Sequence, residues 1–144
     1  MKKEEAINFF NNGCNCSQAV VMPYAEDLNI DHEIVERISV AFGGGMSKQG
    51  KVCGCLSGAL MVIGLKYGED SAKKVQQRIN SYNQGKEMVV KFKEAFGATD
   101  CKDLIKLDLD NSKDMKKAQK EKVFENRCSK LVGQTVEILE EYFK

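Results

Sequence analysis

The chain has 144 residues, the length of a single domain, and an ordinary globular composition with 42% hydrophobic and 30% charged residues. Its 22 Lys and Arg balance its 21 Asp and Glu, and a net charge of +1 argues against nucleic-acid binding through bulk charge. With one Pro, no Trp and few β-branched runs, it lacks the turn and strand signals of a β-sandwich.

The spacing of apolar residues predicts helices along most of the chain. In chain order these cover about residues 3–12, 17–28, 31–42, 54–67, 70–96 and 123–142, with a short helical turn after Asp100. Pro23 kinks or divides the second helix. The glycines at 43–45 end the third helix and open a loop that runs to about Val52.

Residues 54–67 are apolar nearly all round, which is typical of a helix buried on most sides. We therefore expect an all-α fold, a single compact bundle of about five to seven helices over residues 1–144, around this buried central helix. Two other helices carry apolar stripes that should pack on the bundle. These stripes are Ile34, Val35, Ile38, Ala41 and Phe42 in one, and Val75, Ile79, Tyr82, Val89, Phe92 and Phe96 in the other. The five lysines within Lys113–Lys122 indicate a solvated helical face.

The N-terminus is charged, and the longest apolar run, Ala59–Leu65, is far shorter than the roughly 20 residues of a membrane span. We expect no secretory signal, no membrane span and a cytoplasmic location, where thiols are kept reduced. Six cysteines beside one His then indicate metal ligands or redox thiols before structural disulfides. The alternative is that these cysteines are scattered through the core without function.

The placement of the cysteines favours a common centre. Cys16, Cys53 and Cys101 each fall at a predicted helix start, where free N–H groups and the helix dipole favour a thiolate. Cys128 lies on the apolar stripe of the last helix and should point inward. Because these four residues come from four separate elements, we predict that they converge on one site.

The first four cysteines form two Cys-x-Cys pairs, Cys14 with Cys16 and Cys53 with Cys55. Two such side chains on one helix point roughly 200° apart, so only one of each pair can join the centre unless the backbone is irregular. We favour Cys16 and Cys53, and leave Cys14 and Cys55 as accessory thiols.

Three stretches carry a family resemblance. They are GCNCSQAV at 13–20, FGGGM at 42–46 followed by GKVCGCLSGALMVIGL at 50–65, and the pairs Asp100-Cys101 and Arg127-Cys128. Together they resemble the family of redox-active proteins with a C_GCAxxG_C_C signature. The resemblance implies a mostly helical protein whose signature cysteines are Cys16, Cys53, Cys101 and Cys128. It also implies that Gly54 and Gly58 are motif glycines at a cofactor. Cys55 stands where the signature has Ala, and Cys14 where an aromatic residue is common.

Three functions follow from these residues, in order of preference. The first is an electron-transfer protein in which Cys16, Cys53, Cys101 and Cys128 ligate an iron–sulfur cluster or another metal. The resemblance implies the cluster, because a similar domain occurs in multihaem cytochromes with a non-haem iron centre. The second is a metal-free protein in which two of these thiols cycle to a disulfide, and the third is a structural zinc module. The redox partner protein, any catalysed reaction and the oligomeric state are left open.

Two other cofactors are not expected. The chain has no Cys-x-x-Cys-His, so we expect no covalently attached haem. Gly45–Lys51 matches the spacing of a phosphate-binding loop, but Val52 stands where such a loop has the Ser or Thr that binds Mg²⁺. We therefore expect no nucleotide.

Overall fold

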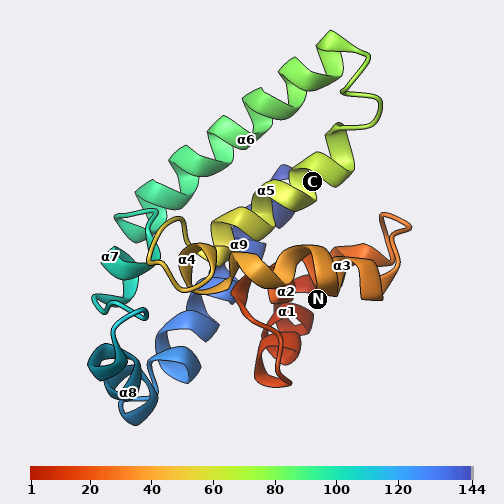
Figure 1. Ribbon diagram of the computed structural model, residues 1–144. Helices are drawn as coiled ribbons and strands as arrows, with labels where there is room; N and C mark the ends of the chain where they lie inside the picture. Colours follow the sequence, from red (N-terminus) through yellow and green to blue (C-terminus); the bar gives the residue numbers. More distant parts are fainter. Residues whose placement is uncertain (144) are drawn as a thin grey trace.

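The computed structural model describes residues 1–143, and the all-α fold is as predicted (Figure 1). The helices are α1 (Lys2–Asn11), α2 (Cys16–Ala25), α3 (His32–Ser39), η1 (Val40–Phe42), α4 (Gly43–Met46), α5 (Gly54–Tyr67), α6 (Val75–Phe96), α7 (Cys101–Ile105), α8 (Ser112–Lys120), η2 (Phe124–Cys128) and α9 (Ser129–Tyr142). Within residues 1–143, β-pairing is limited to one isolated antiparallel bridge between Val52 and Asp100. In the same residues, no helix combines the length and apolar character that crossing a membrane would need.

Helix α5 lies at the centre of the fold and has the bounds expected from the sequence. Residues 54–59, Val62 and Ile63 are buried, and α5 packs against α2, α6 and α9 (Figure 1). Its contact with α2 is close because position 58 is a glycine. A Cβ at Gly58 would lie 2.8 Å from the carbonyl oxygen of Ser17, so a larger residue would push the two helices apart.

The two predicted apolar stripes pack less completely than expected. On α3, Val35 is buried, but Ile34 and Ile38 are 55% and 65% exposed. Helix α6 begins at Val75 and not near residue 70, because its N-cap Lys74 has an extended backbone, at φ −102° and ψ 104°. Figure 1 shows the beginning of α6 extending past the bundle with α5 beside it, and here its stripe is exposed. The helix is anchored nearer its C-terminus by two buried side chains, Met88 and Phe92.

The apolar interior is divided into two clusters. The larger joins α1, α2, α5, α6 and α9, and the smaller lies under α7, α8 and η2. The buried members of the smaller cluster are Cys101, Ile105, Leu109 and Ala118. Figure 1 shows α7 and α8 at one end of the molecule, beside η2. The cysteines lie where these two clusters meet.

Candidate cysteine redox centre

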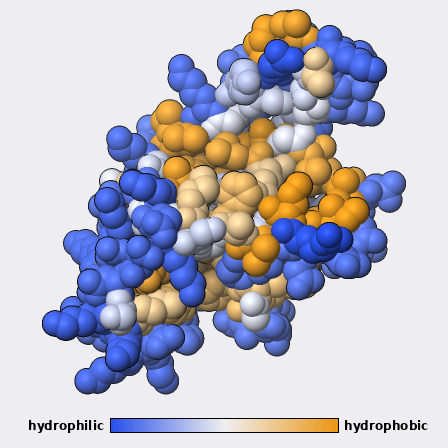
Figure 2. Space-filling view, in the orientation of Figure 1, coloured by the Kyte–Doolittle hydropathy of each residue, from blue (hydrophilic) through white to orange (hydrophobic). Residues whose placement is uncertain are grey.

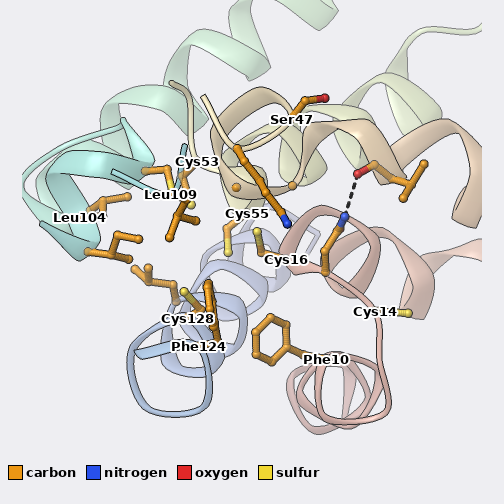
Figure 3. Close-up of a pocket in the computed structure, with 18 of the residues that line it drawn as sticks. Phe10, Cys14, Cys16, Ser47, Cys53, Cys55, Leu104, Leu109, Phe124 and Cys128 are labelled. Atoms are coloured by element: carbon orange, nitrogen blue, oxygen red, sulfur yellow. Dashed lines mark hydrogen bonds between the residues drawn. The ribbon is translucent and has the colours of Figure 1, made fainter. Parts of the chain in front are cut away.

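A cavity of about 540 Å³ lies between the two clusters, and all the cysteines contribute to its lining (Figure 3). The four predicted site residues, Cys16, Cys53, Cys101 and Cys128, are brought together here from α2, the start of α5, α7 and η2. All six cysteines are free thiols. The structure therefore brings together the four thiols that the sequence placed on separate elements.

Cys16 is held by the capping structure at the start of α2. The Asn15 side chain accepts a hydrogen bond from the Gln18 N–H at 3.0 Å, and the Gln18 side chain accepts one from the Asn15 N–H at 2.9 Å. This reciprocal pair satisfies two N–H groups that a helix start otherwise leaves free. Asn15 also donates to the carbonyl of Val40 at 2.8 Å, which ties the start of α2 to η1. The cap therefore holds the backbone of Cys16 in a defined position at the start of α2.

The environment of Cys16 favours its thiolate. A hydrogen bond from the Cys55 thiol is the main cause, and the backbone N–H groups of Gly44, Ser17 and Cys16 itself add to it. Together they outweigh burial and lower the pKa of Cys16 to about 7. Cys55 is the donor of this pair, and its pKa is raised well above the ordinary value by its hydrogen bonds to Cys16 and Cys53 and by burial.

Cys53 and Cys101 are positioned by the same short pairing of two loops. The Cys53 N–H donates to the carbonyl of Thr99 at 2.8 Å, and the Cys101 N–H donates to that of Lys51 at 2.6 Å. These bonds flank the bridge between Val52 and Asp100, so the start of α5 and the start of α7 are held side by side. Burial and the neighbouring charges of Cys53 and Cys16 raise the pKa of Cys101 to about 12.

Cys55 contributes more directly than the sequence indicated. Helix geometry allows only one cysteine of a Cys-x-Cys pair to reach the centre, and the helix-start position of Cys53 favours it over Cys55. Cys53, however, is the N-cap of α5, with an extended backbone at φ −54° and ψ 134°, and does not belong to the helix. Both sulfurs therefore reach the cavity, where Cys55 is completely buried. The available signal was the predicted helix boundary at residue 54, which already leaves Cys53 outside the helix.

Cys14 differs from the other five cysteines. It lies between α1 and α2, and Figure 3 shows its sulfur directed away from the group formed by Cys16, Cys55 and Cys128. Burial and the nearby Glu36 carboxylate raise its pKa. This placement agrees with the preference for Cys16 over Cys14.

A left-handed turn covers the centre from the side of α4. Five consecutive residues have positive φ angles, namely Gly44 (66°), Gly45 (74°), Met46 (62°), Ser47 (55°) and Lys48 (65°). Each of the three residues other than glycine costs about 1–2 kcal/mol in this conformation. The turn brings the Gly44 N–H to the Cys16 sulfur, and Gly45 lies against the Cys101 side chain. The sequence predicts only a loop here, and it carries no signal for a hydrogen bond from this loop to a thiolate.

Cys128 closes the cavity from η2, a π-helical turn over Phe124–Cys128. Such turns are rare and are frequently found at functional sites. Here it directs Phe124 and Cys128 into the same cavity (Figure 3). Burial, with the charges of Cys16, Cys101 and Cys53, raises the pKa of Cys128 above its ordinary value.

Gly54 and Gly58 do not line the cavity, and they lie where α5 packs against α2. Gly58 sets the distance between α2 and α5, and Gly54 lies directly against the Cys16 sulfur. The structure thus gives both glycines a part in packing α5 against α2. Their predicted contact with a cofactor stays a prediction.

The chemistry of the donors fits a soft metal centre, because thiolates are the ligands preferred by iron–sulfur clusters and zinc. Among residues 1–143, however, no three His, Cys, Asp or Glu side chains are arranged as a group that could hold a metal ion. The donor set is compatible with such a centre, and the site is not a preformed cage for a single ion.

Comparison with known proteins identifies the family. Residues 14–142 match the family described as "Putative redox-active protein (C_GCAxxG_C_C)", and the chain belongs to it. It is also 28% identical to an uncharacterized protein of Archaeoglobus fulgidus, over 94% of this chain and 89% of that protein. No solved structure matches the chain.

Proposed function

We propose that this protein transfers electrons through an iron–sulfur cluster held by Cys16, Cys53, Cys101 and Cys128, with Cys55 as an accessory thiol. The observation that carries this proposal is the convergence of these sulfurs, from four separate elements, on one cavity. Membership of a redox-active family supports the same chemistry.

The chain's own residues would prepare this site in three ways. The hydrogen bond from the Cys55 thiol, together with the Gly44 N–H, keeps Cys16 ready as a thiolate near neutral pH. The loop pairing at Val52 and Asp100 holds Cys53 and Cys101 in register. The largely apolar cavity limits access of water to the sulfurs. A bound cluster would supply the capacity to accept and release one electron.

A metal-free thiol–disulfide couple is the second candidate, favoured by the hydrogen bond between Cys16 and Cys55. In this scheme the Cys16 thiolate attacks a partner disulfide and releases one partner thiolate, which takes up a proton. The Cys55 thiol then loses its proton and attacks the mixed disulfide at Cys16, which forms a Cys16–Cys55 disulfide and releases the second partner thiol. The protein gives up two electrons and the Cys55 proton, the second proton comes from the solvent, and one partner disulfide becomes two thiols.

Anaerobic purification separates the two candidates. A cluster predicts visible absorption, iron and sulfide bound in equal amounts, and bleaching in air. A dithiol couple predicts a colourless protein that reversibly loses two thiols per chain. Cys128→Ala should abolish iron binding but leave the two-thiol titration intact, and Cys14→Ala should change neither. A native chain with neither iron nor reversible thiol loss would overturn both candidates.

A further inference from the structure

The cavity contains more than the thiols. Its wall opposite the start of α5 is formed by apolar side chains from α7, the loop after it, α8 and η2, namely Leu104, Ile105, Leu109, Met115 and Phe124. Figure 3 shows Leu104 and Leu109 on one side of the group of sulfurs, with Phe124 beside Cys128. Holding four thiolates does not require this second wall.

The cavity also separates two apolar clusters that would otherwise touch. Leu104 belongs to the larger cluster, whereas Ile105 and Leu109 belong to the smaller one. Side chains that face a void lose the dispersion contacts that a packed neighbour would supply. Apolar cavities of smaller volume, lined by Leu, Ile and Phe, stay free of water and bind benzene. The space of about 540 Å³ is within the range of small-molecule sites.

The lining also indicates the charge of a suitable ligand. Apart from the cysteines, of which Cys16 is held as a thiolate, Lys48 is the only residue with a charged side chain that lines the cavity in the described part of the chain, and it is exposed. A ligand carrying a charge into the apolar part would therefore lose its hydration without gaining a buried partner. Flat rings would find the Phe10 and Phe124 side chains available in the same cavity (Figure 3).

We propose that this cavity binds a small, uncharged, predominantly apolar molecule of one or two rings, between α7–α8 and the cysteines. The ligand fills the gap between the two clusters and stabilises the position of α7 and η2 against α5. This binding goes beyond the redox function and does not depend on which redox chemistry the thiols perform.

Indole is a suitable probe because it is an uncharged, mainly apolar two-ring molecule and the chain has no Trp. The fluorescence of indole, excited where Tyr does not absorb, then reports its binding alone. With the anaerobic, thiol-reduced and metal-free chain, we expect the emission to shift to shorter wavelength and to saturate at one indole per chain. Naphthalene should displace indole, and imidazole, a polar ring, should not.

Leu109→Phe places a bulkier ring in the part of the cavity that indole would occupy and should weaken indole binding about tenfold or more, a loss of about 1.4 kcal/mol. Leu107→Phe is the matched control, because Leu107 lies on the same loop but outside the cavity lining and should leave binding unchanged. Met115→Phe places a ring in the cavity from α8. It replaces Leu109→Phe as the test variant if that variant does not unfold cooperatively. No saturable shift with the native chain, or equal binding by Met115→Phe, would overturn the proposal. Iron uptake is measured in a separate experiment. A chain that takes up no iron would therefore not change the result for indole binding.

Discussion

The sulfur of Cys16 lies directly against Gly54. A Cβ at position 54 would approach Cys16 Sγ to 2.6 Å, closer than any real contact, and would also lie 3.1 Å from the carbonyl oxygen of Phe42. The first turn of α5 therefore leaves just enough room for the thiol of α2. This contact explains physically why a glycine directly follows Cys53.

Gly54→Ala should consequently destabilise the protein and displace Cys16. We expect a loss of about 1–3 kcal/mol in the free energy of unfolding, typical of overpacking, measured by urea denaturation. Gly64→Ala is the control on the same helix, because a Cβ at Gly64 meets nothing within 4 Å. That change should stabilise the protein by about 0.5–1 kcal/mol through helix propensity. Equal effects of the two substitutions would contradict the contact.

The lowered pKa of Cys16 predicts a distinctive pH profile of alkylation. Only the thiolate reacts, so the rate of iodoacetamide modification at Cys16 should rise about tenfold per pH unit and level off above pH of about 7. Cys101, with its pKa raised to about 12, should stay unreactive over this range. Peptide mapping by mass spectrometry assigns the modified residue.

Removing the Cys55 thiol tests the cause of that shift. Cys55→Ala takes away the hydrogen bond that favours the Cys16 thiolate, so the midpoint should move up toward the ordinary value of 9.0. Cys55→Ser keeps a hydroxyl donor and should move it less. An unchanged midpoint in Cys55→Ala would show that the backbone N–H groups alone set the pKa of Cys16.

Gly45 should be even less tolerant of substitution than Gly54. Its φ is +74°, and a Cβ there would lie 2.6 Å from the carbonyl oxygen of Lys51 and 2.7 Å from Cys101 Cβ. Gly45→Ala combines backbone strain with a clash and should cost at least about 3 kcal/mol, measured by urea denaturation. Gly97→Ala has a similar φ of +86° but open space, so strain alone should cost about 1–2 kcal/mol. If the two variants unfold at the same urea concentration, Gly45 does not pack against Cys101 as described.

The sequence was sufficient to predict those features that depend on local periodicity. The bounds of α5 follow from its apolar character, and the helix-start position of Cys16 follows from the Asn15 cap before it. Cys101 also begins its helix as predicted, although the Asp100 side chain makes no capping hydrogen bond. The exposure of Ile79 and Tyr82 could not be predicted, because periodicity identifies a stripe but not whether a neighbour covers it. Cys55 was expected as an accessory thiol, but its hydrogen bond to Cys16 was not, because that contact depends on how α2 and α5 pack in the folded chain.

The left-handed turn at residues 44–48 was also beyond sequence reasoning. Met46, Ser47 and Lys48 have no intrinsic preference for positive φ, so their conformation is imposed by contacts that form only in the folded chain. The same holds for the apolar wall of the cavity, whose side chains lie on several short elements between residues 101 and 128.

Anaerobic reconstitution with iron and sulfide tests the proposed cluster most directly. It compares the native chain with Cys16→Ala and Cys53→Ala, and with Cys14→Ala as the matched control, because the Cys14 sulfur points away from the centre (Figure 3). Circular dichroism of each variant verifies that it is folded. Figure 2 shows apolar residues gathered across the middle of one face, with hydrophilic residues around them, so reconstitution is best followed at low protein concentration. We expect the native chain and Cys14→Ala to bind iron and sulfide in equal amounts with visible absorption, and Cys16→Ala and Cys53→Ala to lose both. A native chain that takes up no iron, or a Cys16→Ala variant that binds as much as the native chain, would contradict the proposed centre.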